Sequence, residues 1–250
     1  MNESEQPDST AVGSGYFNTT HWSVVLLAGK SSSPQRSAAL EKLCRAYWQP
    51  LYFFARRKGH AEEDAKDFTQ QFFARLLERN DFESVDPDKG KFRTFLLTSF
   101  SHFLSNELDR ARAAKRGGGQ KILSFDELQP DRLDEIGQAA ELSPDALFDL
   151  RWAMTVMETA LTGLRKELSS SGKAAQFEGL KRFLTEDAGE GEYAAVAQQL
   201  SMTPSSVAVT VHRLRSRYRE FVRAEVAQTV RNPLELDQEM RHLCEVLSRR

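Results

Sequence analysis

The sequence predicts an all-α protein built from two helical lobes and a linker between them. Apolar residues recur three and four positions apart through most of residues 16–247, as they do on one face of a helix. No two segments show the alternating pattern that is typical of paired strands. Gly117-Gly118-Gly119 and the polar, weakly periodic residues after it are typical of a flexible tether.

These patterns divide the chain into consecutive segments. Residues 1–15 are polar, contain Gly, Ser and Pro, and are expected to be disordered. The first helical lobe is predicted at residues 16–116, the linker at 117–141 and the second lobe at 142–231. A separate amphipathic helix is predicted within residues 232–250, after the break at Asn232-Pro233.

Helix signals define the elements of the first lobe. Pro50 is expected to kink or split its second helix, and Gly59 is expected to end that helix. A turn-rich loop at residues 86–91 precedes the last helix. A short helix that Thr20 can cap is predicted within residues 16–27, and further helices are predicted at residues 37–58, 62–79 and 92–116.

The second lobe begins at Ser143-Pro144-Asp145, which resembles a helix cap with proline at the first helical position. Helices are predicted at residues 143–167 and 174–184. Two further helices follow, and the last amphipathic helix is predicted at 234–247.

The stretch from Tyr193 to Arg223 shows a helix-turn-helix pattern. A short helix ends near Leu200, and Thr203 can cap the next helix, which starts at Pro204. Val207, Val211, Leu214, Tyr218 and Phe221 form the apolar stripe of this second helix.

The opposite side of that second helix is polar and basic. It carries Ser205, Val209, His212, Arg213 and Ser216. Small and hydrogen-bonding groups at a helix start can approach base edges in a major groove, and arginines can contact phosphates. The alternative is a solvated basic helix packed on its neighbour.

Composition excludes several classes of protein. The net charge is −2, so nucleic-acid binding requires local segregation of charge. No apolar run is long enough for a membrane span, and the N-terminus lacks the features of a secretion signal, so a cytoplasmic location is expected. Cys44 and Cys244 are predicted to be small core residues, without a disulfide or a metal site.

Two surfaces of the first lobe are candidate binding sites. Helix 62–79 has a polar side that is either solvated or a docking surface for a basic partner. Helix 92–116 combines aromatic residues with basic and amide groups, a combination that can stack unpaired bases. The alternative is an ordinary aromatic core, and it holds for most of these phenylalanines.

The motifs of both lobes resemble one family. Asp64-Ala65-Lys66-Asp67-Phe68-Thr69-Gln70-Gln71-Phe72-Phe73 and Phe92-Arg93-Thr94-Phe95-Leu96 resemble region 2 of sigma-70 family RNA polymerase sigma factors, of the extracytoplasmic-function (ECF) group. Residues 206–215, which end in His212-Arg213-Leu214-Arg215, resemble region 4 of that family. The resemblance covers roughly residues 16–230.

The resemblance implies a sigma factor that binds core polymerase, recognises two promoter elements and initiates transcription. Its partners would be the β′ clamp and β flap of core RNA polymerase, promoter DNA and an anti-sigma protein, with no cofactor, metal or membrane. The polymerase-binding residues would be Asp64, Asp67, Gln70 and Gln71. The minus-ten residues would be Lys89, Lys91, Arg93, His102, Asn106 and Arg110. The minus-thirty-five residues would be Ser205, Ser206, Ala208, Val209, His212, Arg213 and Arg217.

Other functions are less consistent with the sequence. The five histidines fall in separate predicted elements, and no nucleophile-and-base constellation indicates an enzyme. A helix-turn-helix regulator that acts without polymerase would not need the surface from Asp64 to Phe73. An interaction module held by an anti-sigma protein is the third hypothesis.

Overall fold

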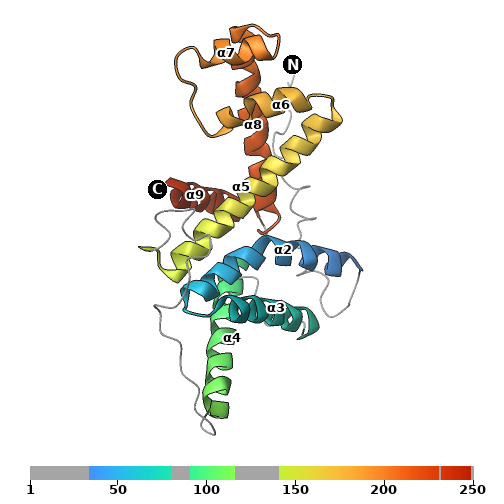
Figure 1. Cartoon of the computed structure of the whole chain (residues 1–250). Coiled ribbons are helices and arrows are strands. Elements are labelled where there is room, and N and C mark those ends of the chain that lie inside the picture. Colours follow the sequence, from blue (N-terminus) through green and yellow to red (C-terminus); the bar gives the residue numbers. More distant parts are fainter. Residues whose placement is uncertain (1–33, 80–90, 116–140, 231, 249–250) are drawn as a thin grey trace, which may run out of the picture. The chain divides into compact units, whose positions relative to one another are not determined.

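The computed structural model describes residues 34–79, 91–115, 141–230 and 232–248, and all regular structure within them is helical (Figure 1). The all-α prediction is confirmed for this part of the chain. The short helix predicted within residues 16–27 and most of the predicted linker lie outside the described residues, as does Lys89.

Three helices account for the described part of the predicted first lobe. They are α2 (Pro34–Arg57), α3 (Glu62–Arg79) and α4 (Phe92–Lys115). The three helices pack on one another, with α3 and α4 both in contact with α2. The predicted ranges of α3 and α4 agree with these bounds to within one residue, because each helix carries a clear apolar period.

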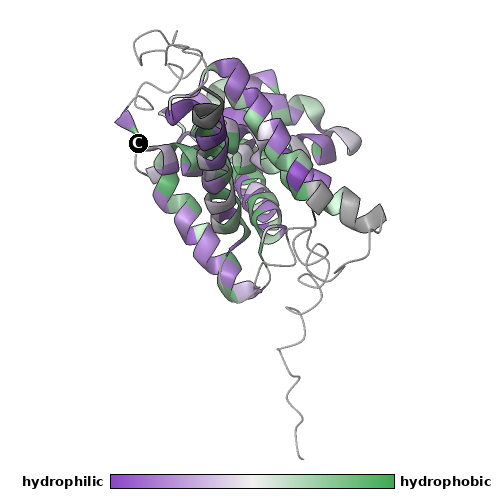
Figure 2. Cartoon of the chain, turned by 90° about the horizontal axis from the view of Figure 1, so that it is seen from below, coloured by the Kyte–Doolittle hydropathy of each residue, from purple (hydrophilic) through white to green (hydrophobic). Residues whose placement is uncertain are grey.

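The remaining elements are also helices. They are α5 (Pro144–Ser170), α6 (Ala174–Leu180), the 3₁₀ helix η7 (Lys181–Leu184), α7 (Glu192–Gln199), α8 (Pro204–Ala227) and α9 (Pro233–Ser248). Figure 2 shows hydrophobic and hydrophilic residues alternating around the helices, as expected when each buries one side.

The chain divides into two compact units, which are described separately. The first unit contains α2, α3, α4, the part of α5 up to Ala153 and the chain from Ala227 onwards, including α9. The second unit runs from Met154 to Val226. The domain bounds predicted from the sequence differ from this division, because they separate the C-terminal helix from both lobes. They remain a prediction.

Aromatic side chains form the centre of the first unit. The ring of Phe100 lies 5.0 Å from that of Phe72 and 6.1 Å from that of Phe54, measured between centroids. Phe103 extends the cluster, with its ring 5.7 Å from that of Phe72. These contacts join α2, α3 and α4, so the aromatic residues of α4 mostly serve the core.

The second unit has its own core. Val196, Ala197, Val207, Val211 and Leu214 pack with residues of α6 and η7. The Arg215 side chain donates hydrogen bonds to the backbone carbonyls of Phe183 and Glu186, each at 2.7 Å. An arginine of α8 therefore fixes the segment that leads towards α7.

Several predicted turns and caps are confirmed. The Ser143 hydroxyl accepts a hydrogen bond from the Ala146 N–H at 3.2 Å, and Pro144 is the first residue of α5. The Thr203 hydroxyl caps α8 by accepting from the Ser206 N–H at 3.2 Å. Gly59 has a φ of 93°, in the left-handed region that suits the residue after a helix.

Two predictions about single residues need correction. Of the two alternatives predicted for Pro50, a kink or a split, the split is wrong, because α2 continues from Pro34 to Arg57. Buried Tyr47, Leu51 and Phe54 flank Pro50, and their packing supports one continuous helix. Cys244 is exposed rather than buried, because the buried stripe of α9 passes through its neighbour Leu243.

Replacing Phe100 by alanine is expected to destabilise the first unit by about 3–5 kcal/mol, because the change leaves a cavity in a close-packed aromatic cluster. Leu108→Ala on the same helix is the control, since Leu108 is 40% exposed and its truncation should cost less than about 1 kcal/mol. Urea unfolding of both variants measures the difference. Equal losses in the two variants would contradict the assigned core.

Candidate polymerase and nucleic-acid interface

The four predicted polymerase-binding residues lie on one exposed side of α3. Asp64, Asp67, Gln70 and Gln71 are all exposed. Between them in sequence, Ala65 and Thr69 are fully buried, and the Thr69 hydroxyl donates to the Ala65 carbonyl at 2.7 Å. The buried positions fix the rotation of the helix, so the polar positions must face outwards.

The charge of this α3 surface is acidic. The one lysine within the segment, Lys66, forms ion pairs with Glu62 and Glu63 on the same helix. Lys66 therefore does not offset the charges of Asp64 and Asp67, because its own charge is paired with Glu62 and Glu63. Such a surface suits a basic partner helix.

Three of the predicted minus-ten residues are exposed on α4. His102 and Asn106 are one turn apart, and both are accessible. Arg110 is exposed near the C-terminal end and pairs with Glu107 at 2.6 Å. These three side chains can reach an external partner.

The other two described minus-ten residues are paired with carboxylates. Lys91 Nζ lies 2.8 Å from Oε1 of Glu239 on α9, close enough for an ion pair but without hydrogen-bond geometry. Arg93 donates from Nε to Oε2 of Glu239 at 3.1 Å, and its Nη1 pairs with Asp149 of α5. The guanidinium also lies 5.1 Å from the centre of the Trp152 ring. The positive charges at the start of α4 are thus neutralised within the first unit.

Burial makes this network strong. The Arg93 side chain is 12% exposed and that of Glu239 only 1%. Burial alone would raise the pKa of Glu239, but the charge and hydrogen bond of Arg93, together with Lys91, outweigh it and hold the pKa below its ordinary value. Glu239 is therefore ionised at neutral pH. A buried carboxylate without these cations would be strongly unfavourable.

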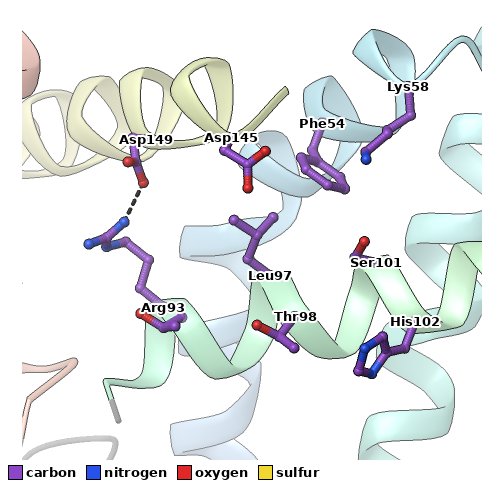
Figure 3. A pocket seen from close by; sticks show the side chains of 10 residues that line it. Phe54, Lys58, Arg93, Leu97, Thr98, Ser101, His102, Asp145 and Asp149 are labelled. Carbon is purple, nitrogen blue, oxygen red and sulfur yellow. Dashed lines mark hydrogen bonds and ion pairs between the residues drawn. The ribbon is translucent and has the colours of Figure 1, made fainter. Parts of the chain in front are cut away.

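A cavity of about 350 Å³ lies beside this network (Figure 3). Phe54 of α2 and Lys58 in the turn after α2 line it on one side, and Asp145 and Asp149 line it from α5. The α4 side carries Arg93, Thr94, Leu97, Thr98, Ser101 and His102. Its volume is within the range of small-ligand sites, and its lining offers hydroxyl, imidazole and carboxylate groups for hydrogen bonding.

The predicted minus-thirty-five residues line the outer side of α8. Ser205, Ser206, His212 and Arg213 are exposed, Val209 is 49% exposed, and Ala208 is half-buried. The stripe opposite is buried as predicted, except that Phe221 is half-buried and Val222 takes the buried position. The turn before α8 places Ser201 at a φ of 53°.

The arginines of α8 differ in their surroundings. Arg217 is exposed but pairs with Glu167 of α5, with Nε 2.9 Å from Oε1, and with Glu220. Arg215 is turned towards the η7 segment, as described above. Arg213 is exposed on the side of Val209 and His212, which leaves it better placed than Arg215 to meet a partner.

The described residues contain no group of three or more His, Cys, Asp or Glu side chains that could hold a metal ion. Within the same ranges, none of the helices is both long enough and apolar enough to cross a membrane.

Comparison with known families addresses the first unit. Residues 43–114 match the family model of sigma-70 region 2. The match starts within α2, covers all of α3 and ends near the end of α4. The similarity to sigma-70 region 2 thus extends over α3, most of α4 and the part of α2 from Leu43 onwards.

The sigma-70 region 2 match covers less than a third of the chain. No curated protein and no solved structure gives a match. The interpretation of α7 and α8 consequently depends on their own geometry.

Sequence reasoning missed two members of the site, Asp149 and Glu239. A signal for Glu239 exists, because it occupies a position of the apolar stripe of α9, between Leu236 and Leu243. A carboxylate at such a position predicts a buried cationic partner, although it does not identify that partner. No comparable signal marks Asp149.

The acid stability of the first unit should depend on Glu239. A carboxyl with a depressed pKa in the folded state stabilises the fold above its ordinary pKa of 4.5, and that contribution is lost as the pH falls through the depressed value. We therefore expect the melting temperature to fall more steeply below pH 4.5 in the unmodified chain than in Glu239→Gln. The exposed Glu245→Gln on the same helix should keep the steep dependence. Parallel curves for all three proteins would contradict the assigned pairing.

Proposed function

We propose that the chain is an ECF-type sigma factor, which binds core RNA polymerase, recognises the minus-ten and minus-thirty-five promoter elements and initiates transcription. The observation that carries the proposal is the coincidence of the sigma-70 region 2 match with an exposed polar surface on α3. The exposed residues are those that the family resemblance assigns to polymerase binding.

In this proposal the α3 surface binds the β′ clamp. Asp64 and Asp67 supply negative charge, and Gln70 and Gln71 supply hydrogen-bonding groups. Complementary charge speeds encounter and fixes orientation, while the amides add specificity. The second unit would contact the β flap, and an anti-sigma protein would compete for one of these surfaces.

The α4 segment is proposed to capture unpaired bases of the minus-ten element. His102 and Asn106 are exposed, and the neighbouring cavity has hydroxyl groups from Thr98 and Ser101. Flipping a base out of the stack costs a few kcal/mol. Stacking worth about 1–3 kcal/mol per base, together with fixed cations, offsets that cost.

The outer side of α8 is proposed to bind the minus-thirty-five element as a duplex. Ser205 and Ser206 stand at the helix start, where small side chains permit a close approach to base edges. Val209 can contact a thymine methyl group, and Arg213 can contact a guanine or a phosphate. The cytoplasm is the expected location, since polymerase and promoter DNA are there.

Reconstituted transcription tests the proposal. Purified core polymerase is mixed with the full chain and a library of genomic DNA fragments, and RNA 5′ ends are sequenced. Discrete start sites that appear only with the chain are expected. A regulator without polymerase docking would instead bind an operator tightly and specifically by itself, and would produce no start sites in this mixture.

Asp67→Lys is expected to weaken binding to core polymerase by on the order of tenfold or more, because the change sets like charges against each other at the α3 surface. The dissociation constant is measured with a fluorescently labelled chain. Glu245→Lys reverses an exposed charge on α9, outside the proposed polymerase surfaces, and should bind core normally. Equal affinity of both variants would remove Asp67 from the interface.

Arg213→Ala is expected to weaken the free energy of DNA binding by about 1–3 kcal/mol at promoters that depend on the upstream element, while core binding is retained. Promoter use is compared by sequencing the transcripts of each variant. Arg213→Lys separates two roles, since lysine keeps a phosphate contact but loses a bidentate base contact. Unchanged promoter choice in both variants would argue against α8 as the recognition helix.

A further inference from the structure

Helix α9 carries a carboxylate where an ordinary packing helix carries an apolar residue. Its buried side consists of Leu236, Glu239, Leu243 and Val246, and Glu239 is only 1% exposed. Burying a carboxylate is costly unless cations compensate for the lost water. The partners of Glu239 therefore indicate what this helix is placed to do.

Both partners are cations at the start of α4. Glu239 contacts Lys91 through one oxygen and Arg93 through the other, at 2.8 and 3.1 Å. The family resemblance assigns both side chains to the minus-ten element, and cations such as these commonly contact phosphates of the DNA backbone. A phosphate offers the same chemistry as the carboxylate, namely two oxygens and a negative charge facing a pair of cations.

One set of cations cannot be paired with a carboxylate and a phosphate at the same place. We propose that α9 is an intrachain inhibitor, whose Glu239 carboxylate occupies the position of a DNA phosphate beside Lys91 and Arg93 until promoter DNA displaces it. This inference rests on the proposed function, since it needs α4 to contact DNA. It assigns α9 a regulatory role in addition to packing.

The features of α9 are consistent with displacement. The helix has 16 residues and is capped by Asn232, whose side-chain oxygen accepts from the Glu235 N–H at 2.9 Å. Three apolar side chains and the Glu239 pair form its buried side. DNA held on polymerase makes many contacts at once. It favours the state in which α9 is displaced from Lys91 and Arg93 to the extent that it binds that state more tightly than the paired state.

The other interpretation is that Glu239 orients Arg93 for DNA binding. The two interpretations predict opposite results. If Glu239 inhibits, then removing its charge strengthens DNA binding. If Glu239 orients Arg93, then the same change weakens DNA binding.

The test uses the full chain with Glu239→Gln, which keeps the shape of the side chain and removes its charge. A fluorescent 20-nucleotide DNA single strand of mixed sequence is the probe. We expect binding on the order of tenfold tighter than in the unmodified chain at low salt. We also expect the salt slope to steepen by about 0.7 for each cation released, and so by up to about 1.4. Lys91→Ala added to Glu239→Gln should remove much of the gain.

Glu245→Gln is the matched control. It removes one negative charge from the exposed side of the same helix, so it separates a local effect from a change in net charge. Affinity that rises equally in both variants would overturn the proposal, as would unchanged or weaker binding by Glu239→Gln.

Hydrogen exchange in the unmodified chain provides a second measurement, which does not depend on the folding of a variant. Peptides from residues 233–248 should exchange faster when core polymerase and the DNA strand are both bound. Unchanged or slower exchange would overturn the proposal. The unmodified chain could direct transcription although Glu239→Gln binds the strand no more tightly and residues 233–248 exchange no faster. In that case only the inhibitory role fails. If the chain directs no transcription, the proposed function fails as well.

Discussion

The pairing of a buried carboxylate with a half-buried arginine links the helices of the first unit. Arg93 is 12% exposed and is held by Glu239 of α9 and Asp149 of α5. These carboxylates come from helices far along the chain, so the pairing ties the start of α4 to both. Removing one partner of such a network leaves a buried charge uncompensated, which typically costs about 3–5 kcal/mol. The packing of α9 and the electrostatics of the α4 surface consequently depend on the same contacts.

The fold could be predicted wherever the signal is local. Helices α3 and α4 follow from apolar periodicity, and the starts of α5 and α8 follow from Ser143 and Thr203 as caps. Pro50 and Cys244 could not be predicted from local rules. Packing on both sides of Pro50 keeps α2 continuous, and a shift of one position along α9 leaves Cys244 exposed.

The exposed surfaces of the site could be predicted for the same reason. Once the buried side of α3 or α8 is known, Asp67 and Arg213 must lie on the other side. The neutralisation of Lys91 and Arg93 could not be predicted, because it comes from residues 56 and 146 positions after Arg93 in the sequence. The family resemblance alone assigns these two side chains to DNA binding. The tertiary structure pairs them with Glu239 and, for Arg93, also with Asp149.

Local opening of promoter DNA tests the central claim most directly. Permanganate oxidises unpaired thymines, and it can be applied to genomic DNA fragments mixed with core polymerase, with and without the chain. The account predicts reactive thymines about ten base pairs upstream of start sites, only when the chain is present. Thymines that stay unreactive, although the polymerase is active and the chain is folded, would contradict it.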